Sequence, residues 1–271
     1  METTIDALGV HLKLEKTDLE KMNEIQKIKF LVLKYLLGST GKFRLGFAWI
    51  FLEPILVSLI YVFLFSVIRS DISGELIIIG IGAYGVFSNS FKAGISGIAI
   101  KNGGFTAERV RTSTIVKSQI ILSIIEGILQ GGSILLLMAI AMDIVFPNAF
   151  SFIIICASIS VLSRMLGFNL VMIVAKTPDV KHVFDFILRL GFFVTPVLYP
   201  IDSCVGLHLQ FNRYNPMSYV IEMSRYHSGV IDYLHNPNEP IQIIMATFLL
   251  ILCFRGVKKL DKYRWETSTW N

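Results

Sequence analysis

The sequence contains few charged residues. Asp, Glu, Lys and Arg occupy 17% of its 271 positions, whereas hydrophobic residues occupy 54%. Soluble proteins carry roughly 25% charged residues on average. The deficit indicates that much of the chain faces lipid, where a charged side chain is costly. It argues against a soluble enzyme and favours an integral membrane protein.

Cysteine and histidine are also sparse. The three cysteines, Cys156, Cys204 and Cys253, show no paired spacing, so they indicate neither a disulfide framework nor a metal site. The five histidines are scattered without the spacing of metal ligands. We therefore expect this chain to bind no metal and no cofactor of its own.

The sequence holds no complete nucleotide-binding loop. Residues 38–42 resemble the end of a phosphate-binding loop, but Leu36 stands where that motif needs glycine, and Phe43 where it needs serine or threonine. Residues 80–85 spell GxGxxG, yet they lie inside an apolar stretch, without the preceding strand that a dinucleotide fold requires. We expect these glycines to allow close helix packing, and we expect no ATP hydrolysis by this chain alone.

Long apolar runs dominate the rest of the chain. A membrane-spanning helix needs about 20 mostly apolar residues. Gly127 and Gly131 form a GxxxG pair, which favours packing inside the chain over a dimer contact. The pattern predicts an all-α integral membrane protein with six transmembrane helices, of which the last two are short. The runs are 46–68, 76–100, 115–142, 151–174, 183–198 and 241–257.

Positive charge gathers in alternate connections. Lys and Arg are frequent before the first run, after the second and fourth, and in the tail, but rare in the other loops. Cytoplasmic loops of membrane proteins collect these residues, so both termini are predicted to be cytoplasmic. The expected divisions are a cytoplasmic N-terminal segment (1–45), a transmembrane domain (46–257) and a cytoplasmic tail (258–271).

Two cytoplasmic elements are expected near the first spans. We expect residues 1–20 to be loosely structured, and residues 22–37 to form a basic amphipathic helix on the membrane surface. The alternative is an extension of the first span, but Gly38 and Gly41 favour a break. The charged connector 101–114 is expected to form a short cytoplasmic helix.

Four ionisable residues fall inside predicted spans. Such residues suggest functional roles. Glu126 and Arg164 lie at similar depths, where they either pair or contact a substrate. Lys92 is close enough to the inner surface to reach it. Arg189, one helical turn after Asp185, is the best candidate for lining a polar path.

Three segments resemble polysaccharide-export permeases of the ABC transporter superfamily. Residues 41–68 resemble the entry to the first span of those proteins. FFVTPVLYP (192–200) resembles the end of their fifth span, and NPMSYVIEMSR (215–225) the segment before the last one. The matching residues of the first segment are Arg44, Gly46, Trp49 and Pro54.

The resemblance implies a half-transporter in a bacterial inner membrane. Two permease chains form the channel as a homodimer, and two copies of a separate ATP-binding cassette subunit, which binds the ATP and Mg, drive it. The cargo is a lipid-linked polysaccharide such as O-antigen, capsular polysaccharide or teichoic acid. Nucleic acid is not an expected partner.

The resemblance also implies roles for particular residues. The connector 101–114 corresponds to a coupling helix, although the proline frequent there in the family is missing. Re-entrant gate helices, facing the periplasm, correspond to 199–225. Sugars stack on aromatic rings, which supports aromatic channel residues. The coupling residues are Phe105, Glu108, Arg109 and Arg111. The channel residues are Tyr61, Phe65, Arg189, Phe192 and Phe193. The gate residues are Pro196, Tyr199, Asn215, Pro216 and Arg225.

Two other functions remain open from the sequence. One is an ABC permease that exports drugs or small lipids. The other is a membrane-embedded sugar-phosphate transferase, which needs acidic or histidine residues clustered at the membrane surface. Asp179, His182 and Asp185 come nearest to such a cluster, but no Lys/Arg-rich phosphate site accompanies them.

Overall fold

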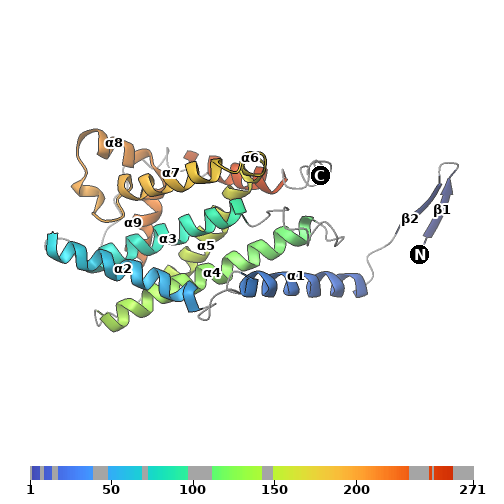
Figure 1. The fold of residues 1–271 in the computed structure, drawn as a ribbon, viewed down its shortest axis with the longest axis horizontal. Helices are drawn as coiled ribbons and strands as arrows, with labels where there is room; N and C mark the ends of the chain where they lie inside the picture. The colour runs from blue at the N-terminus through green and yellow to red at the C-terminus, as the bar shows by residue number, and fades with distance from the viewer. Residues whose placement is uncertain are drawn as a thin grey trace.

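Four long apolar helices form the centre of the structure, a computed structural model (Figure 1). The residues it describes are 2–6, 9–13, 18–38, 48–68, 73–96, 112–141, 149–231, 244–245 and 247–258. The central helices are α2 (Ala48–Ile68), α3 (Gly74–Ser96), α4 (Thr112–Ala141) and α5 (Ala149–Phe168).

These four helices correspond to the first four predicted spans. Within the described residues, three segments are long and apolar enough to cross a membrane, and Ala48–Leu64 is a shorter apolar one. The three are Gly74–Ser96, Ser113–Ile140 and Phe150–Phe168. The architecture is that of a multi-pass membrane protein.

The fifth predicted span corresponds to a shorter helix, and the described part of the sixth is helical. α7 (Val180–Val194) has 15 residues. At 1.5 Å per residue it extends about 22 Å, less than the roughly 30 Å of a hydrocarbon core. Residues 247–258 are also helical, and they pack on the end of α5, where Cys253 Sγ lies 3.5 Å from the carbonyl oxygen of Leu162. The count of six crossings stays a prediction.

Two details of the predicted fold are wrong. Residues 1–20 were expected to be loose, but within them β1 (Glu2–Asp6) and β2 (Gly9–Lys13) pair as an antiparallel hairpin, and α1 begins at Asp18. The hairpin is also an exception to the all-α prediction. Its Thr, Ile and Val residues favour strands, and the register pairs Asp6 with Gly9 at one end and Glu2 with Lys13 at the other.

The fourth apolar run is likewise divided. α5 ends at Phe168, and a separate short helix, α6 (Val171–Lys176), follows. Between them the Nδ2 of Asn169 donates hydrogen bonds to the carbonyl oxygens of Leu166 and Leu252, at 3.2 and 2.8 Å. An apolar run does not reveal such a break, because both pieces are hydrophobic.

Small residues let the central helices approach closely. A Cβ on Gly127 would lie 2.8 Å from the Cα of Ala157, and one on Gly131 would lie 3.0 Å from the Cβ of Cys156. This confirms that the GxxxG pair packs inside the chain. Across α3, α4 and α5, Ser160 Oγ donates to the Ser123 carbonyl at 2.7 Å and lies 2.7 Å from Ser90 Oγ.

The GxGxxG run is also a packing surface. A Cβ on Gly80 would clash with the carbonyl oxygen of Val197, and one on Gly82 would lie 2.8 Å from Ile134. The run sits within α3 rather than between a strand and a helix. Close packing, as predicted, explains these glycines.

α1 (Asp18–Gly38) packs against one end of the central helices (Figure 1). Leu31 is 1% exposed and joins Ile115 and Phe168 in a small apolar cluster. Lys117 Nζ lies 3.0 Å from Glu24 Oε1. A helix at 22–37 is therefore confirmed, while its place on a membrane surface stays a prediction.

Candidate functional site

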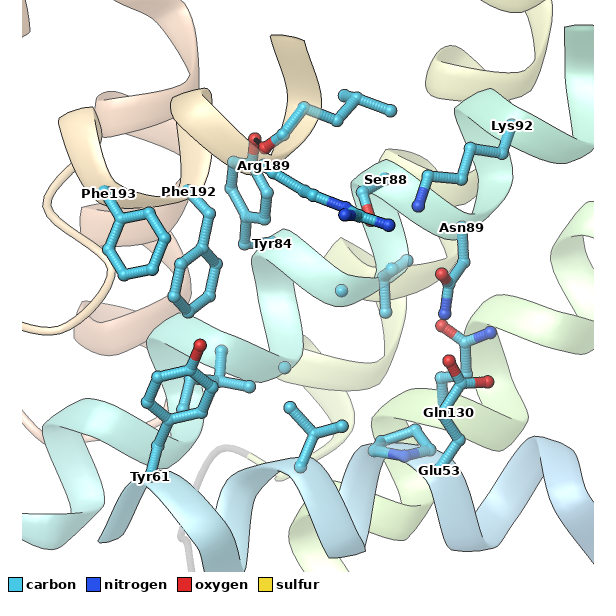
Figure 2. Close-up of a pocket in the computed structure, with 17 residues that line it drawn as sticks. Glu53, Tyr61, Tyr84, Ser88, Asn89, Lys92, Gln130, Arg189, Phe192 and Phe193 are labelled. Atoms are coloured by element: carbon cyan, nitrogen blue, oxygen red, sulfur yellow. Dashed lines mark hydrogen bonds between the residues drawn. The ribbon is translucent and has the colours of Figure 1, made fainter. Parts of the chain in front are cut away.

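A cavity of about 470 Å³, named the central cavity below, opens between α2, α3, α4 and α7 (Figure 2). Its lining has an aromatic part and a polar part. The aromatic part holds Tyr61, Tyr84, Phe192 and Phe193. The polar part holds Glu53, Ser88, Asn89, Lys92, Gln130 and Arg189.

The aromatic part is a set of tilted and edge-on ring contacts centred on Phe192. Its ring centroid lies 5.3 Å from that of Tyr61, 5.5 Å from that of Tyr84 and 5.2 Å from that of Phe193. The Tyr84 hydroxyl donates to the carbonyl oxygen of Leu188 at 2.6 Å. Since a Cβ on Gly191 would come within 2.6 Å of that hydroxyl, glycine is needed for this contact.

Two cations project into the polar part from α3 and α7. Lys92 Nζ lies 3.7 Å from Asp185 Oδ1, so Lys92 pairs across the two helices, and its reach to the inner surface stays a prediction. The carboxylate of Asp185 therefore balances the charge of Lys92. Arg189 is exposed and lines the cavity as predicted, and it has no hydrogen-bond or ion-pair partner among the described residues.

The opposite wall offers hydrogen-bond acceptors. Gln130 of α4 is only 7% exposed, and its Oε1 has no partner in the described part of the chain. Buried polar atoms are normally hydrogen-bonded, so an exception requires an explanation. Glu53 of α2 adds an exposed carboxylate to the same wall. The cavity thus offers both donors and acceptors beside its aromatic rings.

Most predicted channel residues meet in this cavity. Tyr61, Arg189, Phe192 and Phe193 all line it, although the first belongs to α2 and the others to α7. The side chain of Phe65 lies outside the described residues. The structure therefore brings four of the five together, and their contact with cargo stays a prediction.

The predicted gate segment, residues 199–225, contains short helices. They are η1 (Ile201–Ser203), α8 (Gly206–Tyr214) and α9 (Pro216–His227), the last extending two residues further than expected. Asn215 caps α9, since its Oδ1 accepts from the Met217 backbone N–H at 3.0 Å, and Pro216 occupies the first turn. This is a usual helix start. The Nδ2 of Asn215 also donates to Thr195 Oγ1 at 3.1 Å.

The gate segment covers the end of α7. The last carbonyl groups of a helix lack partners within it. Here the Val194 carbonyl accepts from Asn212 Nδ2 at 3.0 Å, and the Phe193 carbonyl accepts from the Tyr199 hydroxyl at 3.0 Å. Burial raises the pKa of Tyr199 to about 12, which keeps that hydroxyl protonated. Side chains of the gate segment are thereby hydrogen-bonded to the end of α7.

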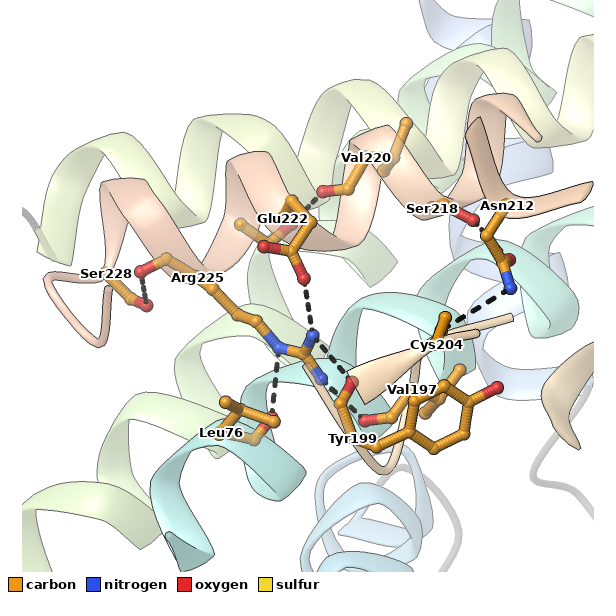
Figure 3. A network of polar contacts seen from close by, with 11 residues as sticks. Leu76, Val197, Tyr199, Cys204, Asn212, Ser218, Val220, Glu222, Arg225 and Ser228 are labelled. Carbon is orange, nitrogen blue, oxygen red and sulfur yellow. Dashed lines mark hydrogen bonds and ion pairs between the residues drawn. The ribbon is translucent and has the colours of Figure 1, made fainter. Parts of the chain in front are cut away.

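Arg225 forms a polar cluster that holds the gate segment in place (Figure 3). Its side chain is fully buried, and its Nη1 lies 2.7 Å from Glu222 Oε1. Its other donors reach backbone carbonyls of Leu76 at 3.3 Å, Tyr199 at 3.3 Å and Val197 at 2.8 Å. One guanidinium thus joins α9, the chain after α7 and the start of α3.

Of the remaining predicted residues, the structure describes the gate residue Pro196 but not the four coupling residues. Pro196 is buried directly before the Val197 carbonyl that Arg225 contacts. The connector residues lie outside the described part of the chain, so their predicted role is untested. They are Phe105, Glu108, Arg109 and Arg111.

A second buried ion pair joins α4 and α5. Arg164 is 1% exposed and contacts Glu126 through Nη2, which confirms that the two residues pair. Its Nη1 donates to Gln119 Oε1 at 2.9 Å. Because Gln119 lies beside Tyr35 of α1, this network reaches the helix at the end of the bundle.

Several site residues carry no decisive sequence signal. Gln130 and Asn89 are uncharged, and amides in apolar runs are hard to separate from ordinary packing residues. Glu222 has a weak signal, since it stands three residues before Arg225 in a short helix. Within the described residues, no group of three or more His, Cys, Asp or Glu side chains could hold a metal ion.

Comparison with known proteins places these features in a family. A family model described as ABC-2 type transporter matches residues 26–227. The polysialic acid transport protein KpsM of Escherichia coli is 26% identical over 247 residues, covering 86% of this chain and 93% of KpsM. The O-antigen export system permease protein RfbA of Myxococcus xanthus is 27% identical over 221 residues, covering 77% of this chain and 81% of RfbA.

Proposed function

Because the chain belongs to the ABC-2 type transporter family, we propose that it is the permease subunit of a polysaccharide exporter. It moves lipid-linked polysaccharide, either O-antigen or capsular polysaccharide, across the bacterial inner membrane. A separate ATP-binding cassette subunit hydrolyses the ATP. One relative named above is a polysialic acid transport protein and the other an O-antigen export permease, and both match this chain over most of their length.

The central cavity is the observation that carries the cargo assignment. A sugar has an apolar C–H face and a rim of hydroxyl groups. Tyr61, Phe192 and Phe193 supply rings for the face, and Gln130 and Glu53 supply acceptors for hydroxyl groups. Aromatic rings with polar neighbours suit such an amphipathic polymer. A small hydrophobic drug needs fewer polar partners.

A second copy of the chain completes the channel in this proposal. α2 and α7, which both line the cavity, expose large apolar side chains, among them Ile60 at 65% and Phe186 at 60%. Such surfaces in one protomer are covered by lipid or by a partner. We assign the partner role to a second permease chain, so that two cavities face each other across one channel.

The proposed topology follows the charge pattern. Six crossings place both termini in the cytoplasm and the gate segment on the periplasmic side. Figure 1 supports this arrangement, because α8 and α9 lie at the opposite end of the bundle from α1. The connector 101–114 then lies on the cytoplasmic side, where it can dock on the ATPase as the coupling helix.

The assignment is tested by purifying this chain with its ATPase. We expect the ATPase from the same gene cluster to co-purify in lipid nanodiscs, and Glu108→Ala or Arg109→Ala to weaken the complex. A charge-assisted hydrogen bond contributes about 1.5–3 kcal/mol, so its loss reduces affinity by roughly 10- to 100-fold.

Arg213→Ala is the matched control, since Arg213 is exposed in α8 at the other end of the bundle. It should leave the ATPase bound. If no ATPase associates with the wild-type chain, the half-transporter proposal fails. Equal loss in Arg213→Ala would contradict the location of the coupling site.

A further inference from the structure

The central cavity presents three kinds of side chain to a molecule that enters it. In Figure 2, Tyr61, Phe192 and Phe193 gather at one end, while Asn89, Gln130 and Glu53 gather at the other. The Arg189 side chain extends from α7 toward Ser88 and Lys92, between the two groups. A ligand that satisfies all three needs an apolar face, hydrogen-bond donors and a negative charge.

In the described part of the chain, Arg189 is a cation of the central cavity that no carboxylate compensates. Asp185, one turn earlier on α7, lies 3.7 Å from the Nζ of Lys92 and so balances that charge. Within the described residues no carboxylate pairs with Arg189. A positive charge among membrane helices usually has a partner or lines a water-filled path. A negative group of the cargo fits this position.

Gln130 gives a second, independent sign of a ligand. Its side chain is more than nine-tenths buried and lines the cavity, yet its Oε1 accepts no hydrogen bond from the described residues. A hydroxyl or amide N–H of a ligand satisfies such an acceptor. The acceptor of Gln130 and the cation of Arg189 therefore match two different groups of one ligand: a hydrogen-bond donor and an anion.

We propose that the central cavity binds an anionic part of the sugar cargo, with Arg189 as the residue that distinguishes anionic from neutral chains. The negative group lies at Arg189, a donor reaches Gln130, and the apolar face rests on Tyr61 and Phe192. Lys92 contributes less because Asp185 already offsets its charge. This inference rests on the proposed export of polysaccharide and specifies the chemistry of that cargo.

Two sources can supply the negative group: carboxylates along an acidic glycan, or phosphates of the lipid carrier. The test therefore uses three probes on the full-length chain in lipid nanodiscs. They are a short oligomer of sialic acid, a neutral glucose oligomer of equal length, and a short-chain prenyl diphosphate. Binding is measured by calorimetry for the wild type, Arg189→Gln and Gln130→Leu.

Arg189→Gln is expected to reduce affinity for the anionic probe about tenfold and to change neutral binding by less than about twofold. Arg189 has no described partner to lose, so the melting temperature of this variant should stay unchanged. Gln130→Leu should weaken acidic and neutral oligomers alike. Arg213→Gln, in exposed α8, controls for the loss of a positive charge.

A loss confined to the sialic acid oligomer supports the inference and identifies the repeating sugar as the source. A loss confined to the prenyl diphosphate supports it and identifies the carrier. Unchanged anion binding in Arg189→Gln, or equal wild-type affinity for all three probes, overturns it. Because ATPase co-purification is measured separately, that result leaves the proposed function standing.

Discussion

Replacing Arg225 by methionine is expected to destabilise the protein by about 3–5 kcal/mol. The guanidinium is fully buried, pairs with Glu222 and donates to three backbone carbonyls. Methionine fills a similar volume but donates nothing, so Glu222 is left as a buried unpaired carboxylate. Thermal unfolding in lipid nanodiscs should show a melting temperature lower by about 10 °C.

Two matched variants separate this cluster from a general loss of charge. Arg213→Met makes the same replacement at an exposed position of α8, and it should change stability by less than about 0.5 kcal/mol. Arg225→Lys keeps the charge but cannot direct its donors along the same fork, so an intermediate loss is expected. If Arg225→Met unfolds at the wild-type temperature, the cluster does not hold the gate segment.

The second large effect is expected at the buried pair between α4 and α5. Hydrogen bonds between membrane helices contribute only about 0.6 kcal/mol on average. Arg164 differs because it is a full charge at 1% exposure, paired with Glu126. Arg164→Met and Glu126→Gln each leave a partner without its counter-charge, so we expect each to cost about 3–5 kcal/mol.

A double-mutant cycle measures the pair itself. The double variant leaves no unpaired charge, so it should cost at least about 2 kcal/mol less than the sum of the single variants, within the roughly 0.5–3 kcal/mol found for contacting residues. Lys117→Met provides the comparison, since Lys117 is 55% exposed in its pair with Glu24 and should cost under about 1 kcal/mol. Strictly additive single variants would contradict the pairing.

The apolar runs predicted the central helices because length and hydrophobicity suffice to identify them. The asparagine–proline pair, Asn215 and Pro216, marked a break in the chain, and the structure shows that Asn215 caps α9 there with Pro216 in the first turn. The pairing of Glu126 with Arg164 was also accessible, since both lie at similar distances along neighbouring spans. Each of these predictions depends on short-range chemistry or on depth in the membrane.

Other features depend on how helices rotate against each other, which no local pattern specifies. Asp185 was expected beside Arg189 on its own helix, but α3 brings Lys92 to it instead. Gln130 is an ordinary amide in the sequence and becomes distinctive only when burial leaves its oxygen unpartnered. The N-terminal hairpin was missed because its strands are five residues each and mix charges with β-branched residues.

The alternative functions account for fewer of these observations. A sugar-phosphate transferase needs a reactive acidic cluster, but Asp185 is paired with Lys92, while Asp179 and His182 are exposed side chains on the start of α7. An exporter of drugs or small lipids is compatible with the family match of this chain. It offers no reason for one cavity to hold the buried acceptor of Gln130 and the cation of Arg189, both without a partner among the described residues.

Surface polysaccharide in cells with and without this chain tests the central claim most directly. The experiment deletes the gene in its own bacterium, restores it on a plasmid, and measures polysaccharide on the cell surface and inside the cell. We expect deletion to remove the surface polymer and to leave lipid-linked polymer inside, and we expect the restored gene to reverse both. Normal surface polysaccharide in the deletion strain, with none retained inside, would contradict the account.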